Sequence, residues 1–405
     1  MIPKNFDDIT KADIDLLVDN KVSEIKTLEY KQELPGRQDK DKKEFLADIS
    51  SFANASGGDV IYGIKEAVDE NGKKTGEPEA VVPLKGVNAD EAKLWIEDLV
   101  RTGIEPRIGI QVKGISGYGD DGKGFVILVR IAQSFASPHM VKLGKSSRFY
   151  CRNSAGKYQL DVQEIRNAFL ATDSQAERIR SFLQDRLAKI MADETPLRLS
   201  THHRLVLHIV PLSSFLNRKR LDLSDEDKLL HFHPILAGSV NYRYNLDGFL
   251  AYKAHRDRGT SESYCQVFFD GSVEAVYANV LRTEGGNTPE MGQTALIPSK
   301  ACEASVVSAI KGYFGGYKTL GIEAPVVVSM TLLGCKGAYM LTDFFSSDSH
   351  PIDRDCVQLP EVTADSLGAE IPTVMKPIFD AVGNACGLPG SPNYTKNGTW
   401  NVRQW

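Results

Sequence analysis

The segment from residue 44 to residue 64 constrains the fold most, because a helix, a glycine pair and a strand follow one another without a break. In EFLADISSFANA (44–55), apolar residues recur at the spacing of one helix face. Gly57 and Gly58 are typical of a helix C-terminus. DVIYGI (59–64) then has the β-rich composition of a buried strand.

Helical and strand patterns alternate along the rest of the chain, which predicts an α+β fold in both halves. A chain of 405 residues is long enough for two or three domains. The polar stretch 192–203 is the best candidate for a boundary. We therefore expect an N-terminal domain over 1–174, a connector helix and linker over 175–203, and a C-terminal α+β domain over 204–405.

Charge and composition exclude several classes of protein. With 48 basic and 53 acidic residues the formal net charge is −5, which excludes a uniformly basic nucleic-acid binder but not a local basic face. The six cysteines form no C-x-x-C pair and are expected to be reduced thiols. The first residues, MIPKNFDDIT, lack the apolar stretch of a signal peptide, and no apolar run is long enough to span a membrane. We expect a cytoplasmic protein without a membrane partner.

Three acidic residues and a lysine form the candidate catalytic site. Glu24 lies five residues before Glu29, and a turn followed by a strand over 27–34 can aim both carboxylates into one pocket. A helix would place them on different faces. Lys31 shares a strand face with Glu29 because it lies two residues further on. Glu66 stands just past the next strand, and it comes near this pair if the two strands are neighbours.

Clustered carboxylates repel one another, so their burial is costly without a cation. Mg²⁺ or Mn²⁺ would relieve that repulsion, and such an ion can activate water and neutralise charge on a phosphodiester. Lys31 would then stabilise the pentavalent phosphorane. Asp59, at the start of the second strand, is a further candidate carboxylate. The alternative is that these acids are solvated strand-edge residues paired with Lys26 and Lys31.

A basic strip is the second candidate site. No acid occurs between residues 141 and 157, where aromatic residues interleave with basic ones. Such a strip would bind phosphates with little sequence preference and with strong salt dependence. The alternative is a solvated face of strands and turns. The strip consists of Lys142, Lys145, Arg148, Arg152 and Lys157.

Three segments in order resemble the Schlafen-type AlbA_2 domain. They are SEIKTLEYK (23–31), FLADISSFANASGGDVIYGI (45–64) and FYCRNSAGKYQLDVQEI (149–165). The corresponding family features are an E-x4-E-[FY]-K segment, a helix that ends in A-F-A-N-[TS]-x-G-G before an [IV]-G-[IV] strand, and a closing strand and helix. The resemblance covers about residues 20–170.

The resemblance implies a chemistry for the acids. In nucleolytic Schlafen proteins, the two glutamates and an acid after the G-[IV] strand form a metal-binding triad, and the enzymes cleave tRNA and rRNA. By this resemblance Glu24, Glu29 and Glu66 would hold Mg²⁺ or Mn²⁺, with Lys31 adjacent. The family's G-[IV]-D-D is GIKE (63–66) here, so a glutamate stands where an aspartate is usual.

The resulting hypothesis is a metal-dependent endoribonuclease acting on tRNA or other structured RNA, as a toxic effector in antiviral defence. The C-terminal domain would then have a sensing or regulatory role. Long Schlafen forms use two AlbA_2-like lobes and this chain shows one, so a homodimer or higher homo-oligomer is expected. The competing hypothesis is a non-catalytic transcriptional regulator that binds DNA through the same domain.

One motif is excluded. GYGDDGKG (117–124) satisfies G-x4-G-K, but Gly124 stands where a phosphate-binding loop has Ser or Thr. The segment also lies between two strand patterns, whereas a phosphate-binding loop opens a helix. A hairpin turn is the better interpretation.

Overall fold

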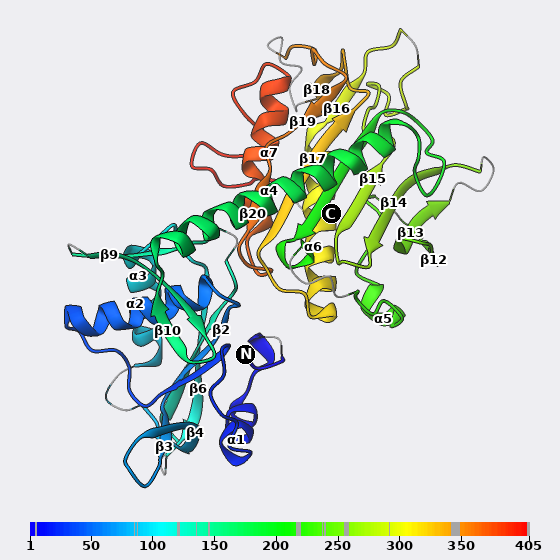
Figure 1. Ribbon diagram of the computed structural model, residues 1–405. Helices are drawn as coiled ribbons and strands as arrows, with labels where there is room; N and C mark the ends of the chain where they lie inside the picture. The colour runs from blue at the N-terminus through cyan, green and yellow to red at the C-terminus, as the bar shows by residue number, and fades with distance from the viewer. Residues whose placement is uncertain are drawn as a thin grey trace. The chain divides into compact units, whose positions relative to one another are not determined.

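The computed structural model describes residues 1–402 except 5, 85, 87, 120–121, 135, 145, 216–219, 237, 239, 255–258, 291 and 342–348. It divides into two compact units, Met1–Ala176 and Glu177–Trp405 (Figure 1). Each unit contains both helices and sheets, so the expected α+β class is confirmed. Among the described residues, no helix combines the length and apolar character that a membrane crossing requires.

Within its described residues, the first unit contains three α-helices of its own, one short 3-10 helix, two four-stranded sheets and a separate two-stranded one. Its elements are η1 (Phe6–Asp8), α1 (Lys11–Asp19), β1 (Leu28–Lys31), α2 (Asp39–Ala53), β2 (Gly58–Tyr62), β3 (Ile64–Val68), β4 (Lys74–Val81), α3 (Ala89–Gly103), β5 (Ile104–Glu105), β6 (Ile110–Tyr118), β7 (Gly124–Ile131), β8 (Met140–Leu143), β9 (Ser146–Asn153) and β10 (Gly156–Gln159).

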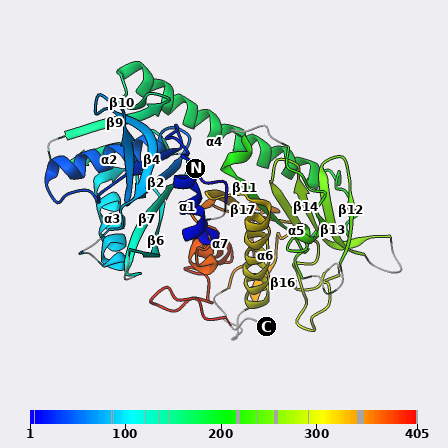
Figure 2. The same cartoon turned by 90° about the horizontal axis from the view of Figure 1, so that it is seen from below.

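The sheet that carries the candidate acids has the order β1-β2-β7-β6. β1 runs parallel to β2 with Glu29 opposite Val60, so the two strands that the sequence singled out are neighbours. Helices α2 and α3 pack on one face of this sheet and α1 on the other (Figures 1 and 2). The second sheet, β10-β9-β8-β5, packs against α2. The edge strand β1 therefore lies where its α2-facing side chains can meet those of the second sheet.

The glycine pair makes the sharp passage from α2 into β2 possible. Gly57 has φ +67°, and a Cβ there would lie 2.6 Å from the Ile131 carbonyl oxygen. A Cβ on Gly58 would lie 2.5 Å from ring carbons of Phe52. Any side chain at either position would separate the helix from the sheet, which explains why glycine is needed at both.

Helix α4 (Val162–Met191) is longer than expected. The sequence patterns predict two helices, over about 161–171 and 175–192, but the structure has one uninterrupted helix. The intervening residues Thr172, Asp173 and Ser174 include no glycine or proline, and the moderate helix propensity of the three does not break the helix. The boundary between the two units therefore falls inside this helix.

The second unit is built on one large sheet of order β12-β13-β14-β15-β11-β17-β19, with β20 also paired to β17, and its described strand pairs are antiparallel. Its elements are β11 (Arg204–Pro211), η2 (Leu212–Phe215), α5 (Glu226–Leu229), β12 (Asn241–Tyr244), β13 (Gly248–Ala254), β14 (Ser261–Phe268), β15 (Val273–Tyr277), β16 (Leu296–Pro298), α6 (Ser299–Leu320), β17 (Val326–Leu333), β18 (Tyr339–Leu341), β19 (Cys356–Gln358), β20 (Val362–Ala364) and α7 (Ile371–Ala385).

Helices cover both faces of this large sheet. Helices α6 and α7 pack on one face, where the main apolar core lies, and the C-terminal half of α4 packs on the other (Figure 2). Strands β14 and β15 pair antiparallel and form a hairpin around Asp270-Gly271, a turn pair that the sequence pattern of 264–277 also predicts. In the first unit, β6 and β7 likewise pair antiparallel across GYGDDGKG, which confirms the hairpin there; residues 120–121 lie outside the described part.

Candidate functional site

A tight turn brings Glu24 and Glu29 to the same site. Ile25 and Leu28 exchange backbone hydrogen bonds of 3.0 and 3.1 Å, which closes the turn. The Glu24 carboxylate then accepts a hydrogen bond of 2.7 Å from the backbone N–H of Tyr30. The chain thus folds back on itself, as the spacing of the two glutamates requires.

Strand β1 sends alternate side chains to two environments. Leu28 and Tyr30 enter the apolar core on the α1 side of the sheet. Glu29 and Lys31 point to the opposite face, toward α2. Glu29 is 8% exposed, so its charge needs partners within the protein.

Two cations hold the Glu29 carboxylate. Lys31 Nζ lies 2.5 Å from Glu29 Oε1, and Arg152 Nη1 lies 2.8 Å from Glu29 Oε2. Burial acts to raise the pKa of Glu29, but the two cations outweigh it and hold that pKa below its usual value. Burial likewise opposes the charge of Lys31, but Asp48 and Glu29 raise the Lys31 pKa. At neutral pH both groups are therefore charged.

Asp48 is a buried acid of this site that the sequence reasoning missed. It lies on α2, 2.7 Å from Lys157 Nζ and 3.7 Å from Lys31 Nζ. Burial, and then the charge of Glu29, raise its pKa. The sequence did contain a signal: Asp48 lies three residues after Phe45 and four before Phe52, so it occupies the apolar face of an amphipathic helix.

Arg152 reaches the site because Asn54 fixes strand β9 to the end of α2. The Asn54 amide donates to the carbonyls of His139 (3.0 Å) and Tyr150 (2.8 Å) and accepts from the His139 N–H (2.6 Å). Two residues beyond Tyr150, the Arg152 guanidinium lies 3.6 Å above the ring of Phe52. Asn54 therefore positions a cation of the site without facing the site itself.

Glu66 enters from β3. Its carboxylate is largely buried and pairs with Lys74 Nζ at 2.5 Å, whereas Lys74 itself is mostly exposed. The charges of Glu66 and Glu29 both act on Glu24 and raise its pKa. The three acids chosen from the sequence are thus electrostatic neighbours. Together with the groups described above they form what we call the acid–base cluster: Glu24, Glu29, Asp48, Glu66, Lys31, Arg152 and Lys157.

Glu24 is an acid of the cluster whose pKa is raised close to neutrality. Burial chiefly, and then Glu66 and Glu29, raise its pKa to about 7 from the ordinary 4.5, although its hydrogen bond from Tyr30 acts in the opposite direction. A carboxyl group with this pKa is about half protonated at neutral pH. A cation bound next to Glu24 would therefore stabilise the ionised carboxylate and lower its pKa.

The basic strip does not act as one surface. Arg152 and Lys157 turn inward to the acid–base cluster. Lys142 pairs with Glu105 at 3.1 Å on the surface, and Arg148 donates to Gln159 there. Lys145 lies outside the described residues. Within the described part of the strip, only Lys142 and Arg148 therefore have largely exposed cationic groups.

The carboxylates of the acid–base cluster are suited to holding a divalent metal ion with two ligands but not with three. Among the described residues, no three Asp, Glu, His or Cys side chains are grouped so that they could hold an ion by themselves. Glu29 is occupied by Lys31 and Arg152. Glu24 accepts a backbone hydrogen bond, and Glu66 is paired with the Lys74 ammonium, which is mostly exposed and not buried as the partners of Glu29 are. These two are the candidate ligands, since Mg²⁺ is commonly held by one or two carboxylates together with substrate phosphates. The residues thus fit a two-carboxylate site and not a three-carboxylate cage.

The family comparison relates the first unit to a family that is associated with nucleic-acid processing. Residues 24–161 match the family described as Schlafen, AlbA_2, and they form a Schlafen-type AlbA_2 domain. The resemblance inferred from the sequence is thereby confirmed.

Two solved structures are similar to part of the chain. One is the N-terminal domain of a RecG-related protein from Nitrosomonas europaea, at 17% identity, with 33% of this chain and 88% of that chain covered and a TM-score of 0.22. The other is the DIP2311 protein from Corynebacterium diphtheriae, at 16% identity, 37% and 30% coverage and a TM-score of 0.24. No curated protein matches the chain.

Glu24→Gln is expected to change how stability depends on pH. The folded-state pKa of Glu24 is about 7 and its ordinary value is 4.5, so the unfolded chain loses this proton first as pH rises. The wild-type protein therefore loses stability between about pH 5 and about pH 7.5, whereas glutamine keeps the hydrogen bond to Tyr30 and has no charge. The Tm of the variant minus that of the wild type should grow over this range.

Glu79→Gln is the matched control, because Glu79 lies on β4, half exposed and paired with Lys65 at 2.8 Å. Its Tm difference should not change with pH. Mn²⁺ should raise the Tm of the wild type at about pH 7.5 more than that of Glu24→Gln. A Tm difference for Glu24→Gln that stays flat from about pH 5 to about pH 7.5 would contradict the raised pKa.

Proposed function

We propose that the first unit is a metal-dependent endoribonuclease and that the acid–base cluster is its active site. The observation that carries the proposal is the contrast between Glu24 and Lys31. Glu24 has a pKa of about 7 because its charge is buried among other acids, while the Lys31 ammonium is held charged by Asp48 and Glu29. Glu24 can bind a divalent cation, and the Lys31 ammonium next to it can bind a phosphate oxygen. Together they suit a phosphodiester that carries a bound divalent ion.

The residues of the cluster divide the work. Glu24 and Glu66 are the proposed ligands of Mg²⁺ or Mn²⁺, and the bound ion would activate water and neutralise charge on the phosphate. Lys31 donates to a non-bridging phosphate oxygen, where negative charge grows during cleavage. Glu29 forms an ion pair with the Lys31 ammonium and orients it. Asp48 is the second carboxylate near the same ammonium. Arg152 balances the charge of Glu29 from the opposite side.

RNA would reach this site past the β8–β9 pair. Arg148, opposite Val141, and Lys142, opposite Ser147, are exposed cations on different faces of this pair, while Lys157 is largely buried against Asp48 and Glu44. Contacts of this kind are made to the phosphate backbone, so they predict weak sequence preference and salt-dependent binding. tRNA or another structured RNA is the proposed substrate.

A cleavage assay with bulk tRNA tests the proposal. The wild-type protein with Mn²⁺ should cut the RNA, and Glu24→Gln should lower the rate by about a hundredfold, the effect expected when one charged group of an active site is lost. Glu79→Gln, on the neighbouring strand but outside the cluster, should cleave normally. Titration calorimetry should show weaker Mn²⁺ binding by Glu24→Gln, independently of turnover.

The competing function gives a different set of results. Tight DNA binding without any RNA cleavage by the wild type would favour the non-catalytic regulator. Cleavage that survives Glu24→Gln and Glu29→Gln would place the chemistry elsewhere. The proposed role as a toxic effector predicts that expression of the wild type, and not of Glu24→Gln, arrests growth of a host cell. The proposed homodimer can be checked by sedimentation of the full chain.

A further inference from the structure

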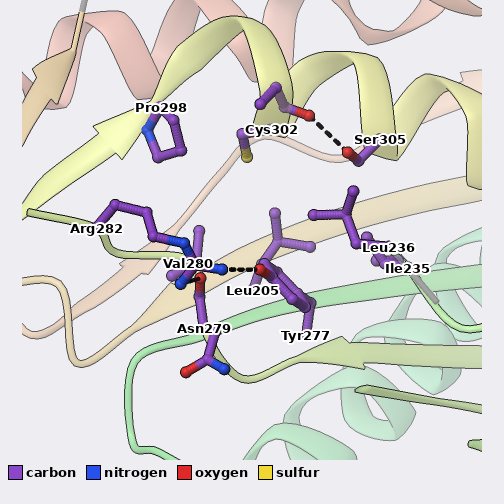
Figure 3. A pocket seen from close by; sticks show the side chains of 11 residues that line it. Leu205, Ile235, Leu236, Tyr277, Asn279, Val280, Arg282, Pro298, Cys302 and Ser305 are labelled. Carbon is purple, nitrogen blue, oxygen red and sulfur yellow. Dashed lines mark hydrogen bonds between the residues drawn. The ribbon is translucent and has the colours of Figure 1, made fainter. Parts of the chain in front are cut away.

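The second unit contains a pocket between α6 and the end of β15. It has about 420 Å³ of empty space, a figure that includes space open to solvent, so it suits a compact ligand. Leu205, Val280, Pro298 and Cys302 give it mostly apolar walls. In Figure 3, Pro298 and Cys302 lie on one side of the space, and Tyr277 and Arg282 lie on the other.

Arg282 is the cation of this pocket, and it is held rigidly. Its Nη1 donates to the carbonyls of Asn279 (2.5 Å) and Leu281 (3.0 Å), and its Nη2 donates to the hydroxyl of Tyr277 (2.5 Å). Its backbone exchanges two hydrogen bonds of 2.8 Å with Leu296. The guanidinium therefore needs little further ordering when a ligand binds.

The partners of the Arg282 guanidinium are all neutral. Among the described residues, no carboxylate forms an ion pair with it, although five N–H donors are available on such a group. The nearby Glu262 carboxylate is paired with Lys253 at 2.6 Å. A fixed guanidinium with neutral partners, next to apolar walls, retains its attraction for an anion.

The side chains on the α6 side of the pocket are neutral. Burial raises the pKa of the Cys302 thiol to about 12, so this group stays neutral. The Ser305 hydroxyl donates to the Ala301 carbonyl at 2.6 Å within α6. Leu236 lies at the rim, 51% exposed and at φ +56°, a backbone conformation that leucine rarely adopts. Strain of this kind is often kept where a ligand is bound.

We propose that this pocket binds a small organic carboxylate with a compact apolar body. The carboxylate would accept hydrogen bonds from Arg282 and from the Tyr277 hydroxyl, and the apolar body would lie against Leu205, Val280 and Cys302. This site is distinct from the acid–base cluster and does not depend on nuclease activity. The proposed ligand of the second unit is thus a small monocarboxylate.

Titration calorimetry on the full-length protein tests the proposal with benzoate and hexanoate as probes. Both should bind, and benzamide, which has the shape of benzoate without its charge, should bind at least about tenfold more weakly. Acetate, which lacks the apolar body, should also bind weakly. Arg282→Gln should reduce benzoate affinity by about tenfold or more, because the charge-assisted hydrogen bonds are lost.

Ala301→Trp provides a test that leaves Arg282 intact. Ala301 lines the pocket from the exposed surface of α6, so a large side chain there should fill the entrance without disturbing the core. Lys311→Trp, exposed on the same helix but not lining the pocket, is the control and should bind benzoate normally. The proposal is overturned if no carboxylate probe binds, if benzamide equals benzoate, or if Ala301→Trp leaves binding unchanged.

Discussion

Glu274→Ala is expected to destabilise the second unit by about 3–5 kcal/mol, since removing one member of a buried ion pair leaves the other charge without compensation. Glu274 is fully buried on β15. Its carboxylate accepts two hydrogen bonds from Arg186 (2.8 and 2.9 Å) and one from Tyr264 (2.8 Å). His208 Nε2 lies 3.1 Å from the same carboxylate. Arg186 lies on α4, so this network fastens that helix to the sheet.

The same network predicts sensitivity to acid. Burial acts to raise the pKa of Glu274, but the hydrogen bonds from Arg186 and His208 outweigh it and lower that pKa to about 2. A carboxyl group whose pKa is depressed stabilises the fold above its ordinary value of 4.5, and the stabilisation is lost as pH falls toward 2. In Glu274→Ala this part of the acid sensitivity should be absent.

Urea unfolding followed by amide exchange of the β14–β15 segment measures the effect. The control is Asp185→Ala, which removes an exposed i,i+4 pair with Lys189 on the same helix and should change stability little. Arg186→Met combined with Glu274→Leu should lose less than Glu274→Ala, because no buried charge is left alone. A loss below about 1 kcal/mol for Glu274→Ala would mean that the network contributes little.

Asp59→Ala is expected to have a similarly large effect on the first unit, about 3–5 kcal/mol. Asp59 and Arg130 are both almost fully buried and are joined by two hydrogen bonds of 2.8 and 3.0 Å. Asp59 also accepts from the backbone N–H of Ile2 at 2.6 Å. The structure therefore gives Asp59 a structural role on β2, and the fourth acid of the cluster is Asp48.

Amide exchange of β2 and β7 measures this loss directly. Asp98→Ala is the control, because Asp98 and Arg101 form a 2.5 Å pair on the exposed side of α3, where screening makes such pairs weak. Asp59→Asn should retain part of the hydrogen bonding and lose less than Asp59→Ala. Equal stability of Asp59→Ala and the wild type would contradict the assignment of a structural ion pair.

Local patterns predicted the strands and helices around the site well, because they depend on neighbouring residues. The i,i+5 spacing of Glu24 and Glu29 and the i,i+2 spacing of Glu29 and Lys31 were sufficient to place them together. The parallel pairing of β1 with β2 could not be predicted from the local pattern, because the register between strands depends on the whole sheet.

Side-chain direction in the second sheet was the part that sequence could not supply. Arg152 and Lys157 belong to a continuous basic strip in the sequence, and only the packing of β9 and β10 on α2 turns them toward Glu29 and Asp48. Asp48 was overlooked because the apolar residues around it dominated the helix pattern. A charged residue on the apolar face of an amphipathic helix is a signal that deserved the same weight as the E-x4-E spacing.

Helix α4 has a practical consequence for separating the two units. Its buried residues are Ile179, Leu183, Arg186, Leu187 and Ile190, and all of them follow residue 176. A fragment that stops at residue 176 would keep a helical half with no fully buried side chain, attached to the first unit by the Phe149–Phe169 ring contact and the Thr172–Ser137 hydrogen bond. A fragment that starts at residue 177 would keep every fully buried side chain of α4. Truncation should therefore leave the second unit's helix folded and the C-terminal turns of the first unit frayed.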